Sequence, residues 1–344
     1  MIQIDGSHGE GGGQILRSSL ALSLLTQQPF RLRNIRANRE KPGLQPQHLM
    51  SVRAAATVGT ATVRGDALKS RELVFEPGPV RGGEYRFDIG TAGATGLVLH
   101  TVYLPLALRT QSPAKIILTG GTHNHHSPCF HFLDTTWRGY LLRIGLSVEL
   151  SLHRTGFYPR GGGEVHATVH PCRKIDGLQI QARPELTNVT GFSASVGLPE
   201  HIAQRQAKQA SHRLRDAGLE VDLRQEQWGG GPGSVIALTF PQSPVPTMFV
   251  GLGARGKPAE RVADEAADEA LAYFDSGEPV DPHSADQVVL PLAFAEEASE
   301  FRVSAVTQHL LTNVAVIRNF VDRDIAIDGA IGQPGVVRIA AQSV

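Results

Sequence analysis

Residues 9–18 read Gly-Glu-Gly-Gly-Gly-Gln-Ile-Leu-Arg-Ser, so an acid lies in a glycine loop and an arginine follows one helical turn into the next segment. The apolar residues from Ile15 to Leu24 recur at helical spacing and predict a helix there. Glycines let the backbone approach a phosphate, which the positive N-terminus of that helix would face. Glu10 could hold a divalent cation while Arg17 binds phosphate oxygens. By itself the stretch favours a tight turn before a core helix, because it matches neither the Walker nor the dinucleotide-binding glycine pattern.

Hydrophobic periodicity predicts that one order of elements, strand-helix-strand-helix-strand-strand, occurs three times along the chain. The first set comprises strand 1–5, helix 13–25, strand 30–36, helix 46–57 and strands 60–64 and 71–75. The second comprises strand 84–88, helix 93–108, strand 115–119, helix 131–144 and strands 147–153 and 164–170. The third comprises strand 178–182, helix 284–293, strand 300–304, helix 310–320 and strands 324–327 and 336–339. We therefore expect an α+β fold, α/β-like in its units, with a large domain of three βαβαββ units.

The third set is interrupted after its first strand. We expect residues 184–277 to form a small inserted α+β domain with two amphipathic helices, and residues 1–183 plus 278–344 to form the catalytic domain. The glycine-rich segment 228–234 of the insert could cradle an anion, but a hairpin turn or a mobile loop is the favoured interpretation. No catalytic residue is assigned to the insert.

Composition indicates an ordinary globular protein of 344 residues, 41% hydrophobic, with a formal net charge of zero. Any nucleic-acid-binding surface must therefore be local. Arginines outnumber lysines 27 to 6, which fits bidentate phosphate recognition, although genomic base composition explains such a skew as often. Cys129 and Cys172 cannot form a disulfide framework, and neither a leader nor a membrane-length apolar run is apparent. We expect a cytoplasmic protein with no membrane partner.

A basic loop, residues 36–48, lies between a predicted strand and a predicted helix. It carries side chains suited to phosphate, namely Arg36, Arg39, Lys41, Gln47 and His48. Loops of this type often carry function. On charge alone, a solvated loop and a phosphate site fit it about equally well.

A histidine-rich loop follows in the second set. It places five metal-ligand types within nine residues, namely His123, His125, His126, Cys129 and His131. Their spacing fits no closed zinc pattern, and neighbouring histidines in a loop converge only partly on one ion. We expect the rim of an active site, with adventitious affinity for metal.

Lys174 begins a Lys-x-Asp-Gly sequence like that of lysine-dependent nucleotidyl transferases. Four residues are a weak signal, no Lys-x-Lys motif follows, and Asp-Gly is common in turns before strands. A turn is the favoured interpretation.

His309 lies at the predicted start of a helix whose apolar residues Leu310, Val314 and Ile317 recur at helical spacing. A helix N-terminus disfavours imidazolium, so it keeps the ring neutral and nucleophilic, and it attracts polyphosphate. With 14 histidines in the chain, this argument alone could not select His309.

Six short blocks carry the strongest functional signal when they are taken in order. They are Asp5-Gly-Ser-His-Gly-Glu-Gly-Gly-Gly-Gln-Ile-Leu-Arg-Ser18, Ile35-Arg-Ala-Asn-Arg-Glu-Lys-Pro-Gly-Leu44, Gln47-His-Leu49, Gly156-Phe-Tyr-Pro-Arg-Gly-Gly-Gly163, Ala285-Asp-Gln287 and His309-Leu-Leu-Thr-Asn313. Together they resemble the RNA 3'-terminal phosphate cyclases nearly end to end, with only 184–277 loosely matched. The resemblance implies three βαβαββ units with a domain inserted in the third. It also implies an ATP-dependent enzyme that converts an RNA 3'-phosphate into a 2',3'-cyclic phosphodiester and releases AMP and pyrophosphate.

The same resemblance implies residue roles. His309 would attack the α-phosphorus of ATP and carry AMP, and Glu10 would coordinate Mg or Mn. Phosphates of ATP and of the RNA end would be bound by Arg17, Arg36, Arg39 and Gln47. The nucleotide pocket would be formed by His100, Pro128, Phe132, His283, Ser284, Ala285, Asp286 and Gln287, with Pro128 and Phe132 packed on adenine.

Three departures from the family pattern concern that pocket. His283 stands where the family often has tyrosine, and His100 where it often has glutamine. The histidine-rich loop also departs from the pattern, which bears on Pro128 and Phe132.

The repeat suggests one further hypothesis. Gln47, the loop 123–131 and His309 each fall just before, or at the start of, the second helix of their units. If the units pack with those ends inward, several positive helix termini would surround one polyphosphate.

Two other functions fit the fold. A relative without activity could serve as an RNA-binding or ribosome-assembly factor, although the joint presence of His309, Glu10 and Arg17 argues against it. An enolpyruvyl transferase could share the repeated architecture, because fold alone does not fix function.

Overall fold

Three four-stranded sheets repeat one strand order in this computed structural model, which describes residues 1–9 and 11–342. The first unit runs β1 Ile2–Asp5, α1 Gln14–Thr26, β2 Phe30–Arg33, α2 Pro46–Val58, β3 Thr62–Arg64 and β4 Leu73–Glu76, with sheet order β1-β2-β4-β3. The second runs β5 Glu84–Asp88, α3 Thr95–Arg109, β6 Ala114–Gly120, α4 Phe130–Phe132, α5 Arg138–Arg143, β7 Val148–Arg154 and β8 Gly163–Val169, with order β5-β6-β8-β7. The third runs β9 Gln179–Ile180, α8 Pro282–Leu292, β14 Ser299–Val303, α9 Gln308–Ile317, β15 Ile325–Asp328 and β16 Gly335–Ile339, with order β9-β14-β16-β15. The expected α+β class with three βαβαββ units is confirmed.

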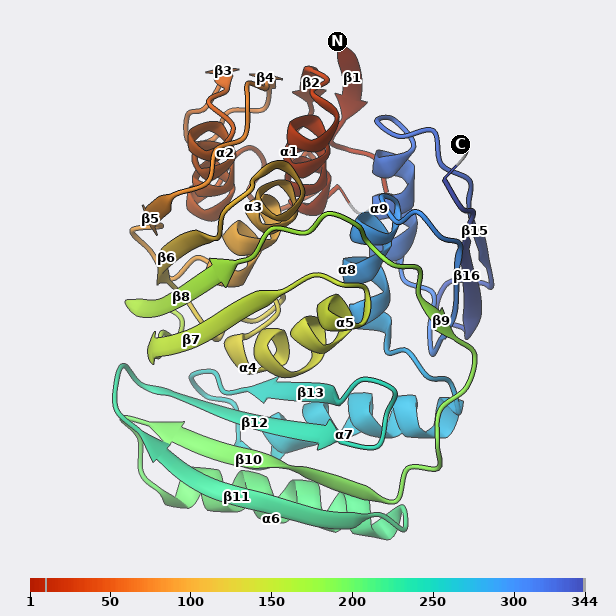
Figure 1. Cartoon of the computed structure of the whole chain (residues 1–344). Coiled ribbons are helices and arrows are strands. Elements are labelled where there is room, and N and C mark those ends of the chain that lie inside the picture. Colours follow the sequence, from red (N-terminus) through yellow and green to blue (C-terminus); the bar gives the residue numbers. More distant parts are fainter. Residues whose placement is uncertain (10, 343–344) are drawn as a thin grey trace.

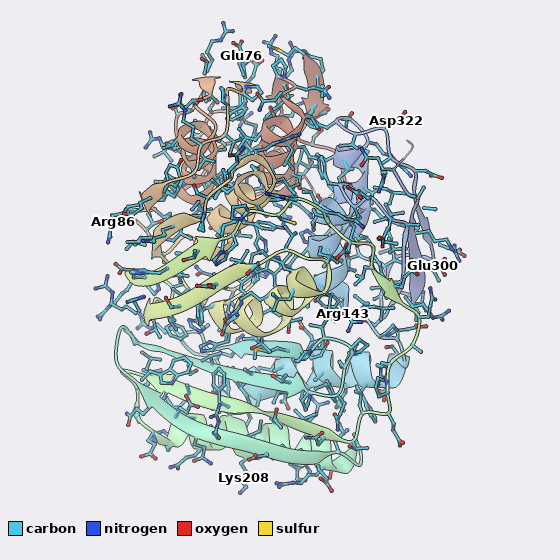
Figure 2. All side chains as sticks on the ribbon, viewed as in Figure 1. Glu76, Arg86, Arg143, Lys208, Glu300 and Asp322 are labelled. Atoms are coloured by element: carbon cyan, nitrogen blue, oxygen red, sulfur yellow. The ribbon has the colours of Figure 1, made fainter. Side chains whose placement is uncertain are left out.

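The helices of the three units pack on one another, and the sheets lie outside them (Figure 1). α1 contacts α2, α3 and α9, and α8 contacts α9. α3 is buried on almost every side, which its nearly unbroken apolar sequence requires. Charged side chains such as Glu76 and Lys208 lie at the periphery (Figure 2). Among the described helices, none has both the length and the apolar character needed to cross a membrane.

A fourth sheet comes from the segment between β9 and α8. It contains β10 Asn188–Val196, α6 His201–Asp216, β11 Glu220–Trp228, β12 Gly233–Phe240, β13 Thr247–Leu252 and α7 Ala259–Ser276, in the order β11-β10-β12-β13. The chain leaves the third unit at Ile180, which pairs with Phe301 of β14, and returns at Val280, which is bridged to Val303 of the same strand. Because strand residues rise about 3.3 Å each, the two ends lie close together.

The inserted sheet is covered on both faces. Ile236 and Leu238 of β12 pack beneath α6 and α7, whereas Val235 and Ala237 of that strand join the core of the three units. This alternation is the two-residue period of a strand buried on both sides.

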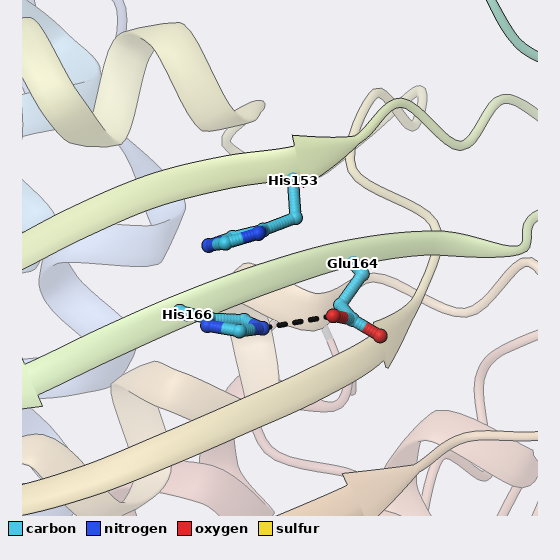
Figure 3. A group of neighbouring side chains, drawn as sticks. All are labelled: His153, Glu164 and His166. Carbon is cyan, nitrogen blue, oxygen red and sulfur yellow. Dashed lines mark hydrogen bonds and ion pairs between the residues drawn. The ribbon is translucent and has the colours of Figure 1, made fainter.

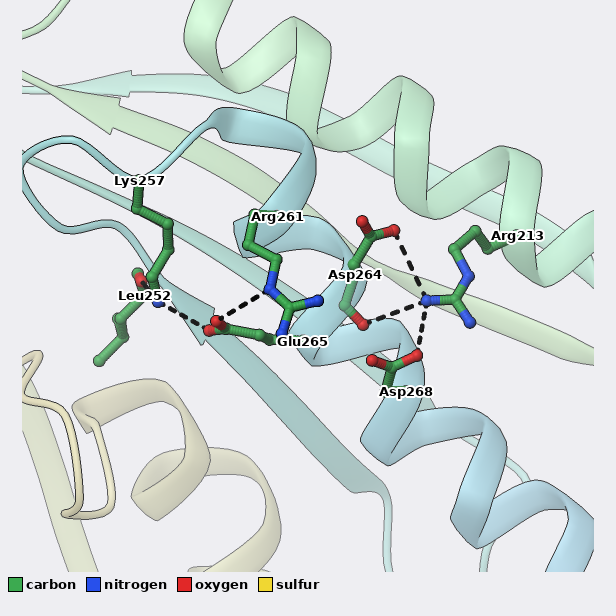
Figure 4. A network of polar contacts seen from close by, with 7 residues as sticks. All are labelled: Arg213, Leu252, Lys257, Arg261, Asp264, Glu265 and Asp268. Atoms are coloured by element: carbon green, nitrogen blue, oxygen red, sulfur yellow. Dashed lines mark hydrogen bonds and ion pairs between the residues drawn. The ribbon is translucent and has the colours of Figure 1, made fainter.

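Ion pairs join the two helices of the insert (Figure 4). Arg213 of α6 lies 2.6 Å from the Asp268 carboxylate and 3.5 Å from that of Asp264, both on α7. On the other flank of α7, Lys257 lies 2.7 Å from Glu265. These contacts fix α7, which supplies part of the candidate site.

Hydrogen bonds fix the insert to the second unit. The Thr136 hydroxyl donates to the carbonyl of Pro246 over 2.8 Å and accepts from the amide of Met248 over 3.0 Å. Arg143, seen between the two parts in Figure 2, donates to the carbonyl of Pro244 over 2.7 Å. The start of β13 is therefore anchored on the helical segment of the second unit.

Two sequence expectations need correction. The helix expected at 131–144 is divided by a π-helical turn, Leu133–Trp137, between α4 and α5. The hairpin turn expected at 228–234 is wrong, because β11 and β12 do not pair with each other and β10 lies between them. Glycines specify a change of direction locally, but the pairing partner depends on the whole sheet.

Candidate functional site

A cavity of about 560 Å³ lies where the three units and the inserted segment meet. This volume lies within the usual range for small-molecule sites. Helices α1, α3, α7, α8 and α9, the loop 124–129 and strand β13 form its walls. The expected site residues that line it are Arg17, His100, Pro128, Phe132, His283, Asp286, Gln287 and His309.

His309 lies in the first turn of α9, as the sequence predicts. Thr307 caps this helix, its hydroxyl accepting a hydrogen bond from the amide of Leu310 over 3.0 Å. His309 Nδ1 lies 2.7 Å from Oε1 of Gln14 on α1. Because an amide oxygen can only accept, this contact places a proton on Nδ1, and in the neutral ring Nε2 is then the nitrogen with the lone pair. Sequence reasoning assigned Gln14 no role, although it lies in the glycine motif.

The glycine loop before α1 has the conformations that favour glycine. Gly9 and Gly11 have φ values of +58° and +59°. A Cβ at Gly9 would collide with the hydroxyl of Thr312 on α9, so the loop packs directly against the helix that carries His309. Glu10, the expected metal ligand, lies outside the described residues.

The basic loop 36–48 lies beside the cavity. Arg36 donates to the carbonyl of Gly43 over 3.3 Å, and Gln47 accepts from the amide of Ala94 over 3.1 Å. Arg36, Arg39 and Gln47 are not among the residues that line the cavity. Among the arginines expected to bind phosphate, Arg17 therefore lines the cavity, whereas those of the loop 36–48 do not.

The expected convergence of three segments holds for two of them. Loop residues 124–129 and His309 meet at the cavity, whereas Gln47 holds the start of α3 instead.

Two buried histidines, His48 and His100, lie close enough to Arg17 for its charge to affect their pKa values. Burial, together with the charges of Arg17 and Arg36, lowers the pKa of His48 to about 3. Burial and the charge of Arg17 lower the pKa of His100 to about 3. Both rings are therefore neutral, and Nε2 of His100 is buried without a hydrogen-bond partner among the described residues.

The histidine-rich loop is divided between two environments. His125 and His126 line the cavity, whereas His123 Nε2 and His131 Nδ1 lie 3.0 Å apart, and the His131 ring stacks on Trp228 of the insert. Within the described chain, no third ligand joins this pair into a metal cluster. The loop forms a rim of the cavity and a contact with the insert.

Helix α8 presents one face to the cavity. His283, Asp286 and Gln287 line it, at helical spacing. Ser284 and Ala285 are 2% and 0% exposed and do not line the cavity. Helix periodicity thus separates five consecutive expected residues into two groups.

The insert supplies a whole wall that the sequence did not predict. Its cavity residues are Met248, Phe249, Val250, Leu252, Glu265 and Glu269. Glu269 lies 3.1 Å from Nε2 of His283. Burial acts to lower the pKa of His283, but the hydrogen bond and charge of Glu269 outweigh it and raise that pKa to about 9. No local motif marks these residues, because strand β13 and helix α7 reach the site only by packing.

Lys174 takes no part in this cavity. Its ammonium lies 2.9 Å from Glu297, 3.8 Å from Glu296 and 3.7 Å from Asp176. The Glu297 hydrogen bond and charge raise the pKa of Lys174, which keeps the amine protonated and poorly nucleophilic. This placement argues against nucleotidyl transfer by Lys174, although residues 174–177 precede β9 without forming the expected turn.

Comparison with known proteins adds independent information. The profile of a family described as RNA 3'-terminal phosphate cyclase matches residues 8–327. A Ralstonia nicotianae protein of that name is 43% identical over 339 residues, covering 98% of this chain and 96% of its own. A Trichormus variabilis protein of that name is 44% identical over 328 residues, covering 93% and 94%, and one from Salmonella paratyphi C is 41% identical over 337 residues, covering 98% and 97%.

Proposed function

The chain belongs to the RNA 3'-terminal phosphate cyclase family, and on that premise we propose that it uses ATP to convert an RNA 3'-terminal phosphate into a 2',3'-cyclic phosphodiester. It would thus be a ligase that forms a phosphoric ester bond and releases AMP and pyrophosphate. The observation that most supports this proposal is His309, at a helix N-terminus on the cavity wall, with Nδ1 bonded to Gln14.

In the first step, Nε2 of His309 attacks the α-phosphorus of ATP. A phosphorus–nitrogen bond forms, the bond to the bridging oxygen breaks, and pyrophosphate leaves. The Gln14 carbonyl oxygen favours this attack, because it keeps the proton on Nδ1 and the lone pair on Nε2. The product is a histidyl adenylate.

In the second step, an oxygen of the RNA 3'-phosphate attacks the adenylyl phosphorus and frees His309. The adjacent ribose 2'-hydroxyl then attacks the activated 3'-phosphate, and AMP leaves with the bridging oxygen. Because this hydroxyl is tethered beside its target, effective molarity supplies much of the rate. The proposal therefore assigns no general base.

Phosphate binding falls to the arginine side of the site. Arg17 lines the cavity, and we propose Arg36, Arg39 and Gln47 for phosphates that extend beyond it. The low pKa of His48, due to burial and to the charges of Arg17 and Arg36, supports a cationic environment there. Fixed positive charge is the main requirement of phosphoryl transfer.

The adenosine would occupy the cavity between Pro128, Phe132, Asp286 and Gln287, with Ser284 and Ala285 supporting α8 from the core side. Four buried polar atoms of lining residues lack hydrogen-bond partners among the described residues, namely Nε2 of His100, Oδ1 of Asn124, Nε1 of Trp137 and Oε1 of Gln287. A base with donors and acceptors would satisfy those that a small side-chain movement turns toward the cavity, which supports a nucleotide rather than an apolar ligand.

We also propose that Glu10 binds Mg²⁺ or Mn²⁺ with ATP. Asp286 adds a carboxylate to the lining, and carboxylate oxygens are the ligands that such hard cations prefer. When bound, the ion would offset negative charge on the phosphates.

An RNA with a 3'-phosphate end is the proposed partner, and the cytoplasm is the proposed compartment. The free cysteines Cys129 and Cys172 support a reducing environment.

The proposal is tested with α-labelled ATP and Mg²⁺ or Mn²⁺, by measuring label retained on denatured protein. We expect label on the wild type and on Lys174→Ala, and none on folded His309→Ala. Incubation with a 3'-phosphorylated RNA should then give a cyclic end resistant to phosphatase. If folded wild-type protein retains no label and cyclises no RNA, the proposed enzymatic activity is wrong, and an RNA-binding function would take its place.

A further inference from the structure

Three potential metal ligands lie together outside the cavity, on the sheet of the second unit (Figure 3). They are His153 of β7 and Glu164 and His166 of β8, and one ligand atom from each lies within 4.8 Å of the other two. The two imidazole rings have centroids 3.6 Å apart, and His166 Nε2 lies 2.8 Å from a Glu164 oxygen. In the described chain, this is the one such group.

Strand alternation places the three side chains on one face of the sheet, beside a β-bulge. Ser151 pairs with His166, but Arg154 rather than His153 pairs with Glu164, so β7 has one extra residue here. Alternation along β8 already places Glu164 and His166 on one face. Alternation along β7 places His153 on the same face as Ser151, which pairs with His166, and the bulge at His153 and Arg154 follows directly, as bulges often do at functional positions.

The group faces solvent. Val165 and Ala167, the alternate residues of β8, are 4% and 3% exposed and point into the core. Glu164 and His166 therefore point outward, and His153 is exposed. An ion could reach the group without any change in the core.

The ligand types indicate which ion would bind. Two imidazoles and one carboxylate form a set that zinc uses with water in its remaining position, whereas Mg²⁺ prefers oxygen ligands alone. Ligand atoms of tetrahedral zinc lie about 3.3 Å apart, given bonds of about 2 Å. The two imidazole rings are stacked with an interplanar angle of 22°, so their lone pairs are nearly parallel. Binding one ion therefore requires rotation of a histidine ring as well as closure of ligand atoms that lie within 4.8 Å of one another.

We propose that His153, Glu164 and His166 form a binding site for a zinc-like transition-metal ion, separate from the nucleotide cavity. The ion would join β7 to β8 at the base of the loop 155–162. That loop contacts the insert, since the Thr155 hydroxyl donates to the carbonyl of Gly229 over 3.1 Å. Metal binding should therefore slow amide hydrogen exchange in the loop.

Titration with Co²⁺ in millimolar Mg²⁺, on protein without a histidine tag, tests the site by the visible absorption of bound cobalt. We expect one site in the wild type. We expect His153→Ala and His166→Ala to weaken it at least about tenfold, since even loss of an outer-shell partner costs that much.

The matched control is His170→Ala. His170 directly follows the last residue of β8, Val169, and its Nε2 lies 2.9 Å from the Glu149 carboxylate. A second control, the His125→Ala and His126→Ala double variant, tests the histidine-rich loop. Both controls should bind cobalt as the wild type does.

The proposal is overturned if the wild type binds no cobalt, if the His153→Ala and His166→Ala double variant binds it normally, or if the loop variant abolishes binding. Melting curves without metal verify that each variant is folded, and Glu164→Gln replaces any variant that is not. None of these measurements depends on ATP or RNA, so the result is independent of the proposed enzymatic activity.

Discussion

The imidazole of His309 is oriented by Gln14, whose amide oxygen lies 2.7 Å from Nδ1. Gln14→Leu removes this acceptor and keeps much of the side-chain volume. We expect the rate of the proposed adenylation to fall about 5- to 160-fold, because loss of a hydrogen bond worth about 1 to 3 kcal/mol misorients the nucleophile. Rapid-quench measurement of adenylate formation checks this.

Gln308→Leu is the matched control, because this neighbouring glutamine contacts Thr312 rather than His309. An orienting role predicts a lower kcat for Gln14→Leu with little change in the KM for ATP. A rise in KM alone would instead make Gln14 an ATP ligand.

His100 should make the stability of the protein depend on pH. Burial and the charge of Arg17 lower its folded-state pKa to about 3, whereas an unfolded histidine titrates near pH ~6.5. Between these values the unfolded chain binds a proton that the folded chain does not, so stability falls as the pH falls. From pH ~6.5 to ~5 the loss is about 1.6 kcal/mol.

Urea unfolding of wild type and His100→Leu at both pH values measures how much His100 contributes to the pH dependence of the unfolding free energy. The variant should lose less stability on acidification than the wild type. Because the pKa of the buried His48 is also about 3, the stability of both proteins should still depend on pH. Equal losses in the two proteins would refute the assignment to His100.

Single residues were predictable where chemistry restricts the residue type. Gly9 and Gly11 have positive φ values, which a glycine run anticipates. The contact between Gln14 and His309 was not predictable from pattern, because 295 residues separate the partners.

At the scale of elements, the cap of α9 controls the turn that carries His309. The Thr307 hydroxyl accepts a hydrogen bond from the backbone amide of Leu310 over 3.0 Å. Thr307→Ala should cost about 1 kcal/mol of unfolding free energy and reduce adenylate yield, because the first turn frays. Chemical denaturation and the labelling assay measure the two effects.

Thr307→Ser keeps the hydroxyl and should therefore retain most of the unfolding free energy and of the adenylate yield. If the serine and alanine variants behave alike, the cap is not what holds this turn.

Elements also show where periodicity is informative. The helix expected at 284–293 is α8, and its spacing explains why His283, Asp286 and Gln287 line the cavity while Ser284 and Ala285 do not. The π-helical turn Leu133–Trp137 was not predictable, since it depends on packing around one extra residue in the turn.

For the whole molecule, the inserted sheet joins two cores. Val235 and Ala237 pack with the three units, while Ile236 and Leu238 pack under α6 and α7. We propose that 184–277 is an inserted domain that nevertheless unfolds together with the rest, because separation would expose apolar surface on both sides.

Unfolding curves by tryptophan fluorescence and by far-ultraviolet circular dichroism test this. Trp137 belongs to the second unit and Trp228 to the insert, so Trp137→Phe and Trp228→Phe report each part separately. The curves should coincide. Two distinct midpoints would show that the insert unfolds independently.

Local sequence patterns were enough to predict the repeated units, the interruption of the third, the glycine loop before α1 and the start of the helix that carries His309. Each of these depends on periodicity or on the conformational range of a residue type, which act over a few neighbours. Tertiary structure alone decided which residues line the cavity, because α1, α3, α8, α9 and the insert reach it from distant parts of the chain. It also brought Gln14 to His309 and His153 to His166, since the energy of such contacts arises only when distant segments pack.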